Sequence, residues 1–200
     1  MGIYLNPDNI EFYRATNSEI YVDKTELIRF TNRYLDTEHR NLCVSRPRRF
    51  GKSMAANMLV AYYSRGCDSR GLFNNYKIAQ DKDFEKHLNK YNVIHVNMLD
   101  FLGRTDSVDD MINYLTRRLL WELKKEYSDV ECFDWTDIVD VLTSIYYAKQ
   151  QSFIIIIDEW DCVFRRYPND YGEQKVYLDF LRFFIKDKVY MSLSYMTGIL

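Results

Sequence analysis

Short apolar runs alternate with longer amphipathic stretches along this chain. Four runs rich in β-branched and other apolar residues predict strands, and they cover residues 41–46, 91–101, 152–161 and 188–200. Apolar positions that recur every three or four residues predict helices over residues 53–64, 108–127, 137–149 and 173–186. Strands separated by helices are typical of a mostly parallel sheet with right-handed crossovers, so we expect a three-layer α/β/α fold.

The third apolar run, "SFIIIIDEWD" over residues 152–161, has four consecutive isoleucines followed by acidic residues. A continuous apolar run of this length is typical of a parallel strand that is buried on both faces. The strand would end at Asp158, at the carboxyl edge of the sheet, where ligands bind in open α/β folds.

Two regions divide the chain in this interpretation. Residues 1–38 form an N-terminal segment that carries the motif "YVDKT" at 21–25 and packs on the core. We expect a short strand or extended stretch at 20–22, followed by a helix with Leu27, Ile28 and Phe30 along one side. Residues 39–200 form the core, which we expect to be incomplete because it stops at or just beyond its fourth strand. The spacing of the YVDKT motif indicates no chemistry.

Composition narrows the class of protein without identifying it. The 200 residues have a net charge of −2 and are 47% hydrophobic, which is ordinary for one soluble domain and argues against a uniformly basic nucleic-acid-binding surface. The longest apolar run is too short to span a bilayer, and no signal peptide opens the chain. The four cysteines are far apart, so we expect free thiols, no metal site built from them and a cytoplasmic location.

The loop "SRPRRFGKS" after the first predicted strand contains the end of a phosphate-binding motif, Gly51 to Ser53. At a strand–loop–helix junction, backbone N–H groups at the helix N-terminus can surround phosphate groups. Lys52 would then neutralise the outer phosphates and Ser53 would complete the coordination of Mg²⁺. The alternative is an ordinary turn with a solvated lysine. The residues expected to contact nucleotide in this loop are Arg46, Pro47, Arg48, Arg49, Phe50, Gly51, Lys52, Ser53 and Met54.

Arg46 stands where such loops normally have their first glycine. Glycine permits a tight turn there, so Arg46 predicts a different backbone path, one that the fixed φ of Pro47 could set. Arg46, Arg48 and Arg49 could bind a triphosphate through bidentate contacts, or they could face outward toward a nucleic-acid backbone. Two alternatives remain. The loop could be basic and solvated, or the acids after the third strand could balance its charge.

The acids that follow the isoleucine strand are the second candidate feature. Asp158 could hold Mg²⁺ through water, and Glu159 could polarise an attacking water as the catalytic base. Helix capping is the structural alternative for both residues, since acids favour a helix N-terminus. Asp161 could likewise contact the magnesium shell or cap a helix. Thr197, near the end of the fourth strand, could sense the γ-phosphate or be an ordinary surface threonine.

Other charged residues have weaker interpretations. We read His39, His87 and His95 as core or surface residues because each is isolated in the sequence. The pairs Arg117-Arg118 and Arg165-Arg166 are expected on solvated faces or in a contact between subunits.

The motifs together resemble the AAA-ATPase-like family of bacterial proteins. The resemblance rests on "YVDKTELI", "SRPRRFGKS", "IIIIDEWD" and "YMTGIL", and it runs from about residue 20 to the last residue. It implies a P-loop ATPase core of the ASCE type that uses ATP and Mg²⁺. In that core Lys52 and Ser53 belong to Walker A, Asp158 to Walker B, and Glu159 is the catalytic glutamate. Family members often continue into a nuclease-like domain, which implies DNA as a partner of the longer protein.

Two functions from different classes follow. The first is a Mg²⁺-dependent ATPase that drives a switch or motor, linked to DNA processing or defence and with no membrane partner. The second is a nucleotide-responsive module with little hydrolysis, in which ATP orders a surface for a protein or DNA partner. Further copies of the chain are also candidate partners. A small-molecule kinase would need an acceptor pocket and a lid that the sequence does not indicate, and a GTPase would need an "NKxD" motif that it lacks.

Overall fold

A four-stranded, all-parallel sheet forms the centre of the computed structural model, which describes residues 2–199. The strands are β1 (Asn41–Ser45), β2 (Asn92–Asn97), β3 (Phe153–Asp158) and β4 (Met191–Gly198). Their spatial order is β1-β4-β3-β2, so β4 lies between β1 and β3 and pairs in parallel with both. The prediction of an α/β fold with a parallel sheet is therefore confirmed.

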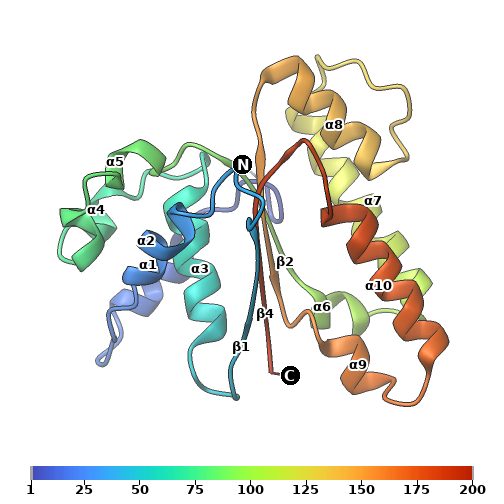
Figure 1. Cartoon of the computed structure of the whole chain (residues 1–200), viewed down its shortest axis with the longest axis horizontal. Helices are drawn as coiled ribbons and strands as arrows, with labels where there is room; N and C mark the ends of the chain where they lie inside the picture. Colours follow the sequence, from blue (N-terminus) through green and yellow to red (C-terminus); the bar gives the residue numbers. More distant parts are fainter. Residues whose placement is uncertain (1, 200) are drawn as a thin grey trace.

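Helices cover both faces of the sheet and make three layers (Figure 1). One face carries α1 (Ile10–Thr16), α2 (Glu26–Asn32), α3 (Lys52–Tyr63), α4 (Arg70–Phe73), the 3-10 helix η1 (Lys77–Gln80) and α5 (Phe84–His87). The other face carries α6 (Met98–Leu102), α7 (Val108–Glu126), α8 (Ile138–Lys149), α9 (Cys162–Arg166) and α10 (Tyr171–Ile185). The four long helices expected from periodicity are confirmed to within about two residues at each end.

The isoleucines of β3 explain how one strand supports both layers. Side chains alternate between the faces of a strand, so Ile154 and Ile156 pack with α1 to α5, whereas Ile155 and Ile157 pack with α6 to α10. All six residues of β3 are buried. The expectation of a strand covered on both faces is confirmed.

The second predicted strand is shorter than the apolar run suggested. β2 ends at Asn97, and residues 98–102 form helix α6 instead of continuing the strand. The Asn97 side chain accepts a hydrogen bond from the N–H of Leu99 at 3.0 Å, which caps the new helix. A side-chain cap thus ended a strand that apolar content alone would have extended to residue 101.

The N-terminal region packs against the α3 layer. Phe12 of α1 and Ile28 of α2 are fully buried in the same cluster as Leu59 of α3. Residues 20–22 are irregular in structure, and α2 begins at Glu26. The division of the chain at residue 38 stays a prediction.

Candidate functional site

The carboxyl ends of the four strands meet at one edge of the sheet. The pairing register aligns Val44 of β1, Thr197 of β4, Asp158 of β3 and Asn97 of β2 in one row. The loop with Gly51 to Ser53 leaves β1 one residue beyond this row. The structure therefore brings the basic loop and the acidic pair to the same edge, with the end of β4 between them.

The loop turns through two residues with left-handed backbone conformation. The N–H of Arg46 bonds to the carbonyl of Gly198 at 3.2 Å, which extends the contact between β1 and β4 by one residue. Arg49 has φ of 69° and Gly51 has φ of 74°. Gly51 is the N-cap of α3 and tolerates this conformation, whereas arginine is strained in it by about 1–2 kcal/mol. The left-handed positions of the loop are therefore Arg49 and Gly51, next to α3, and not Arg46.

Lys52 is the buried cation of the loop. It is 9% exposed, and its Nζ donates a hydrogen bond to the carbonyl of Pro47 at 3.2 Å. Ser53, the next residue of α3, is exposed. A buried ammonium held across a turn by a neutral carbonyl is suited to receive an anion, because no carboxylate of the described residues pairs with it.

The three arginines of the loop are exposed and unpaired with acids. Within residues 2–199, neither Arg46, Arg48 nor Arg49 forms an ion pair. Among the described residues, the acids after the third strand therefore form no ion pair with these arginines, contrary to one interpretation of the sequence. Bidentate contacts to phosphate and contacts to nucleic acid both stay predictions.

A buried polar group without a partner lies beside Asp158. The Oγ1 of Thr197 is fully buried and has no hydrogen-bond partner among the described residues. Asp158 is 2% exposed and accepts the N–H of Glu159 at 3.0 Å. A buried hydroxyl left unsatisfied costs about 1–3 kcal/mol, so its position in register with a carboxylate fits a site that a ligand completes.

Helix capping does not explain the two acids. Helix α9 begins at Cys162, and the residue at its N-cap is Asp161, which makes no side-chain capping bond. The Asp161 carboxylate is fully buried and accepts the N–H of Ile199 at 3.1 Å. It thus fastens the end of β4 to the segment after β3, so the alternative of a side-chain cap is wrong, whereas a contact with the magnesium shell stays a prediction.

Glu159 is held by an arginine that the sequence did not indicate. Its backbone has φ of 54°, a left-handed conformation that is uncommon outside glycine and concentrates at functional sites. Its carboxylate forms an ion pair with Arg165, and Arg165 also pairs with Asp161 at 3.2 Å. Arg165 lies four residues after Asp161, which is one helical turn, and this spacing is the signal that could have identified it. Arg165 is thus partly buried and paired with acids and does not lie on a fully solvated face, and its alternative role in a contact between subunits stays a prediction.

One phenol and two thiols near this edge are neutral at physiological pH. Burial raises the pKa of Tyr195 to about 12, and the Asp158 charge acts in the same direction. Burial likewise raises the pKa of Cys162 to about 12 and raises that of Cys43. These three groups therefore do not compete with the carboxylates as bases.

A lysine from outside the loop contacts it. The Nζ of Lys24 donates a hydrogen bond to the carbonyl of Phe50 at 2.7 Å. Lys24 belongs to the YVDKT motif, to which the sequence assigned no chemistry. Sequence spacing cannot reveal such a contact, because the two residues are 26 positions apart and lie in separate irregular segments of the chain.

A cavity of about 760 Å³ lies elsewhere, on α7, and is lined among others by Arg117, Trp121 and Trp135. It includes no residue of the loop or of the acidic pair. The candidate phosphate site is defined instead by the hydrogen bonds of the loop and by the register of the strand ends.

The fold and the loop together define the class of the protein: a parallel α/β domain with a Gly-Lys-Ser loop at a strand–helix junction, compatible with a P-loop core. The family model described as "Predicted AAA-ATPase" matches residues 10–200. The chain belongs to this AAA-ATPase-like family, which supports binding of ATP. The comparison with curated proteins gives no match. Among residues 2–199, no helix has the length and apolar character that crossing a membrane requires.

Proposed function

We propose that the chain is an ATP-binding P-loop ATPase domain of the ASCE type. One observation carries the proposal: β4 lies between the strand that precedes the loop and the strand that ends in Asp158, and it presents the unpartnered hydroxyl of Thr197 there. The resemblance to related ATPases implies a polar residue near the end of this strand that senses the γ-phosphate. Thr197 is therefore the candidate sensor of the γ-phosphate.

The residues of this edge match the chemistry of Mg-ATP. The N–H groups at the start of α3 and the Lys52 ammonium would bind the phosphates, as cations and helix N-termini do. The Ser53 hydroxyl and the Asp158 carboxylate are oxygen ligands of the kind that Mg²⁺ prefers, and they would hold the ion, directly or through water. When bound, the ion neutralises phosphate charge.

Glu159 is the proposed catalytic base. Its carboxylate would orient a water molecule and accept its proton while Lys52 stabilises the charge on the phosphates. In the conformation described here, the carboxylate is paired with Arg165. Turnover would require Glu159 to exchange this partner for water.

The ion pair between Glu159 and Arg165 also favours the second candidate function. If the pair persists when nucleotide is bound, the base is not free and hydrolysis is slow. The domain would then act as a nucleotide-responsive module that orders a surface for a partner. Association with DNA, association with further copies of the chain, and a cytoplasmic location rest on the sequence analysis alone.

Titration of Mg-ATP into the wild-type chain and into Lys52→Ala, by isothermal calorimetry with GTP as competitor, tests the proposal. A unit charge about 4 Å from phosphate contributes up to about 4 kcal/mol at an effective dielectric constant of 20, so we expect affinity to fall by up to about 1,000-fold. Lys175→Ala is the matched control, because Lys175 is exposed on α10 in the opposite layer. Equal affinity of the wild type and Lys52→Ala would refute a phosphate site at this loop.

A further inference from the structure

The YVDKT motif, residues 21–25, docks through alternate side chains. The ring of Tyr21 lies against that of Tyr76 with centroids 5.2 Å apart. The Asp23 carboxylate accepts the N–H of Lys77 at 3.2 Å, and the buried Thr25 hydroxyl accepts that of Ile78 at 3.3 Å. Positions 21, 23 and 25 therefore share one partner, the segment around η1.

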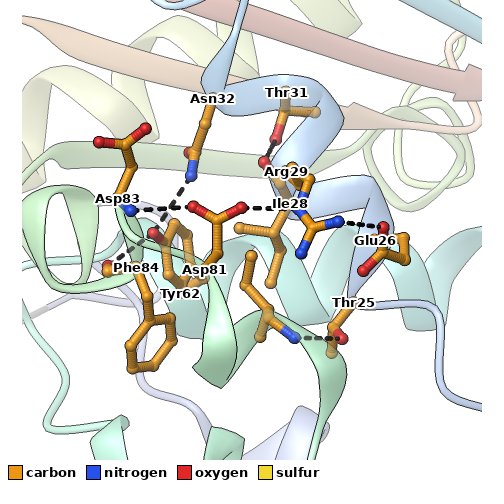
Figure 2. Close-up of polar contacts among 11 residues, drawn as sticks. Thr25, Glu26, Ile28, Arg29, Thr31, Asn32, Tyr62, Asp81, Asp83 and Phe84 are labelled. Carbon is orange, nitrogen blue, oxygen red and sulfur yellow. Dashed lines mark hydrogen bonds and ion pairs between the residues drawn. The ribbon is translucent and has the colours of Figure 1, made fainter.

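This docking is reinforced on both sides. Partial burial alone would raise the pKa of Asp23, but hydrogen bonds from the N–H groups of Thr25 and Lys77 lower it below its usual range. In α2, Arg29 pairs with Asp81 at 2.6 Å, just beyond η1 (Figure 2). Figure 2 also shows Arg29 between Asp81 and Glu26, so α2 and the segment after η1 are joined by a short charged network. The backbone of the motif is thus fixed independently of the loop.

Lys24 is the member of the motif that faces the other way. Its ammonium contacts the peptide between Phe50 and Gly51, and a Cβ built on Gly51 would lie 2.6 Å from Lys24 Nζ. The described peptide bonds are trans, so the C=O and N–H of this peptide point in opposite directions. A lysine that binds the Phe50 carbonyl from outside therefore directs the N–H of Gly51 away from itself.

The contact of Lys24 with the phosphate loop places this lysine among other positive charges. Lys24 adds a fifth cation to Arg46, Arg48, Arg49 and Lys52, and within residues 2–199 none of the five forms an ion pair with an acid. Like charges repel, so an ammonium placed here is unfavourable for the empty domain and becomes favourable when the loop holds an anion.

We propose that Lys24 is a positioning residue of the phosphate loop, which fixes the Phe50–Gly51 peptide so that its N–H faces the bound phosphates. This inference rests on the proposed nucleotide site and adds residues 21–25 to it. Lys24 acts through the loop backbone and does not touch the nucleotide. Its loss changes the shape of the loop equally for any nucleotide that occupies it.

The test measures Kd for Mg-ATP and Mg-ADP with Lys24→Met, which retains most of the apolar stem, and with Lys24→Arg, which retains a donor. We expect Lys24→Met to weaken both nucleotides by a similar factor of about 10, because one charge-assisted hydrogen bond to the loop is lost. Lys24→Arg should restore most of the affinity. The melting temperature of the nucleotide-free protein should fall by no more than about 4 °C, because the lost hydrogen bond contributes about 1 kcal/mol.

Lys77→Met is the matched control, since Lys77 is exposed, lies beside Asp23 and loses the same charge. Wild-type affinity in Lys24→Met, combined with lost binding in Lys52→Ala, would overturn the inference and leave the nucleotide site intact. A loss confined to ATP would also overturn it, because it would indicate direct contact with the γ-phosphate. Absence of binding by the wild type would overturn the proposed function itself.

Discussion

Replacing Gly51 with alanine probes the loop without removing any charge. Gly51 has φ of 74°, a conformation that costs an L-residue about 1–2 kcal/mol. The new Cβ would lie 2.6 Å from Lys24 Nζ, so the flexible ammonium must withdraw from the Phe50 carbonyl and lose about 1 kcal/mol of hydrogen bonding. The lower entropy of the unfolded alanine chain offsets about 0.5–1 kcal/mol. The net destabilisation is about 2 kcal/mol.

Thermal unfolding of the nucleotide-free protein, followed by circular dichroism, measures this value. For a chain of this size, about 2 kcal/mol corresponds to a decrease in melting temperature of about 4–8 °C. Gly71→Ala is the control, because Gly71 is exposed in α4 and a Cβ there meets no atom within 4 Å. We expect Gly71→Ala to leave the melting temperature unchanged or slightly higher, since alanine favours helix.

A combined variant separates the two contributions to the loss. Gly51→Ala and Lys24→Met disrupt the same hydrogen bond, so together they should destabilise by about 1 kcal/mol less than the sum of their separate effects. If Gly51→Ala melts within about 1 °C of Gly71→Ala, the reasoning about the left-handed turn is refuted. If the two effects are strictly additive, Lys24 and the Gly51 peptide do not interact energetically.

Two further predictions concern Glu159 and His95. Glu159→Gln should retain the Mg-ATP affinity of the wild type and abolish phosphate release by a longer protein that hydrolyses ATP; equal turnover would exclude Glu159 as the base. Burial lowers the pKa of His95 to about 4, so its neutral form stabilises the fold above pH 6.5, and this contribution, up to about 3 kcal/mol, is lost as the pH falls from 6.5 toward 4. Urea unfolding at several pH values should show a smaller loss for His95→Gln than for the wild type, and parallel curves would contradict a histidine that partial burial keeps neutral.

The sequence predicted the elements that depend on periodic or continuous apolar patterns. The isoleucines of β3 and the apolar face of α7 are examples. Burial of a strand on both faces, or of a helix on one face, requires such patterns directly. The region between residues 65 and 90 was not predicted, since α4, η1 and α5 are each four residues long and show no period. Tertiary packing around Phe73 and Ile78, both fully buried, organises this region instead.

Candidate site residues were predictable where local motifs encode them. The Gly51–Ser53 triplet and Asp158 could be located by their position at strand ends. The contact of Lys24 with the loop could not, because it depends on how distant segments meet. For the ion pair of Glu159 with Arg165, the four-residue spacing from Asp161 to Arg165 was the only local signal. Asp161 shows the same limit: its sequence position suggests a cap, but its carboxylate bonds to the N–H of Ile199 across the sheet.

The strand order also determines when this edge of the sheet can form during synthesis. β1 and β3 do not pair with each other; each pairs with β4, which is the last of the four to be made. The side-chain bond between Ser194 and Asn41 joins residues 153 apart, a separation typical of slow-forming contacts. A nascent chain that already has β2 and β3 still leaves β1 without a partner strand. Nucleotide-binding competence would therefore arise in a single late step, when β4 inserts, and would report that the four described strands have paired.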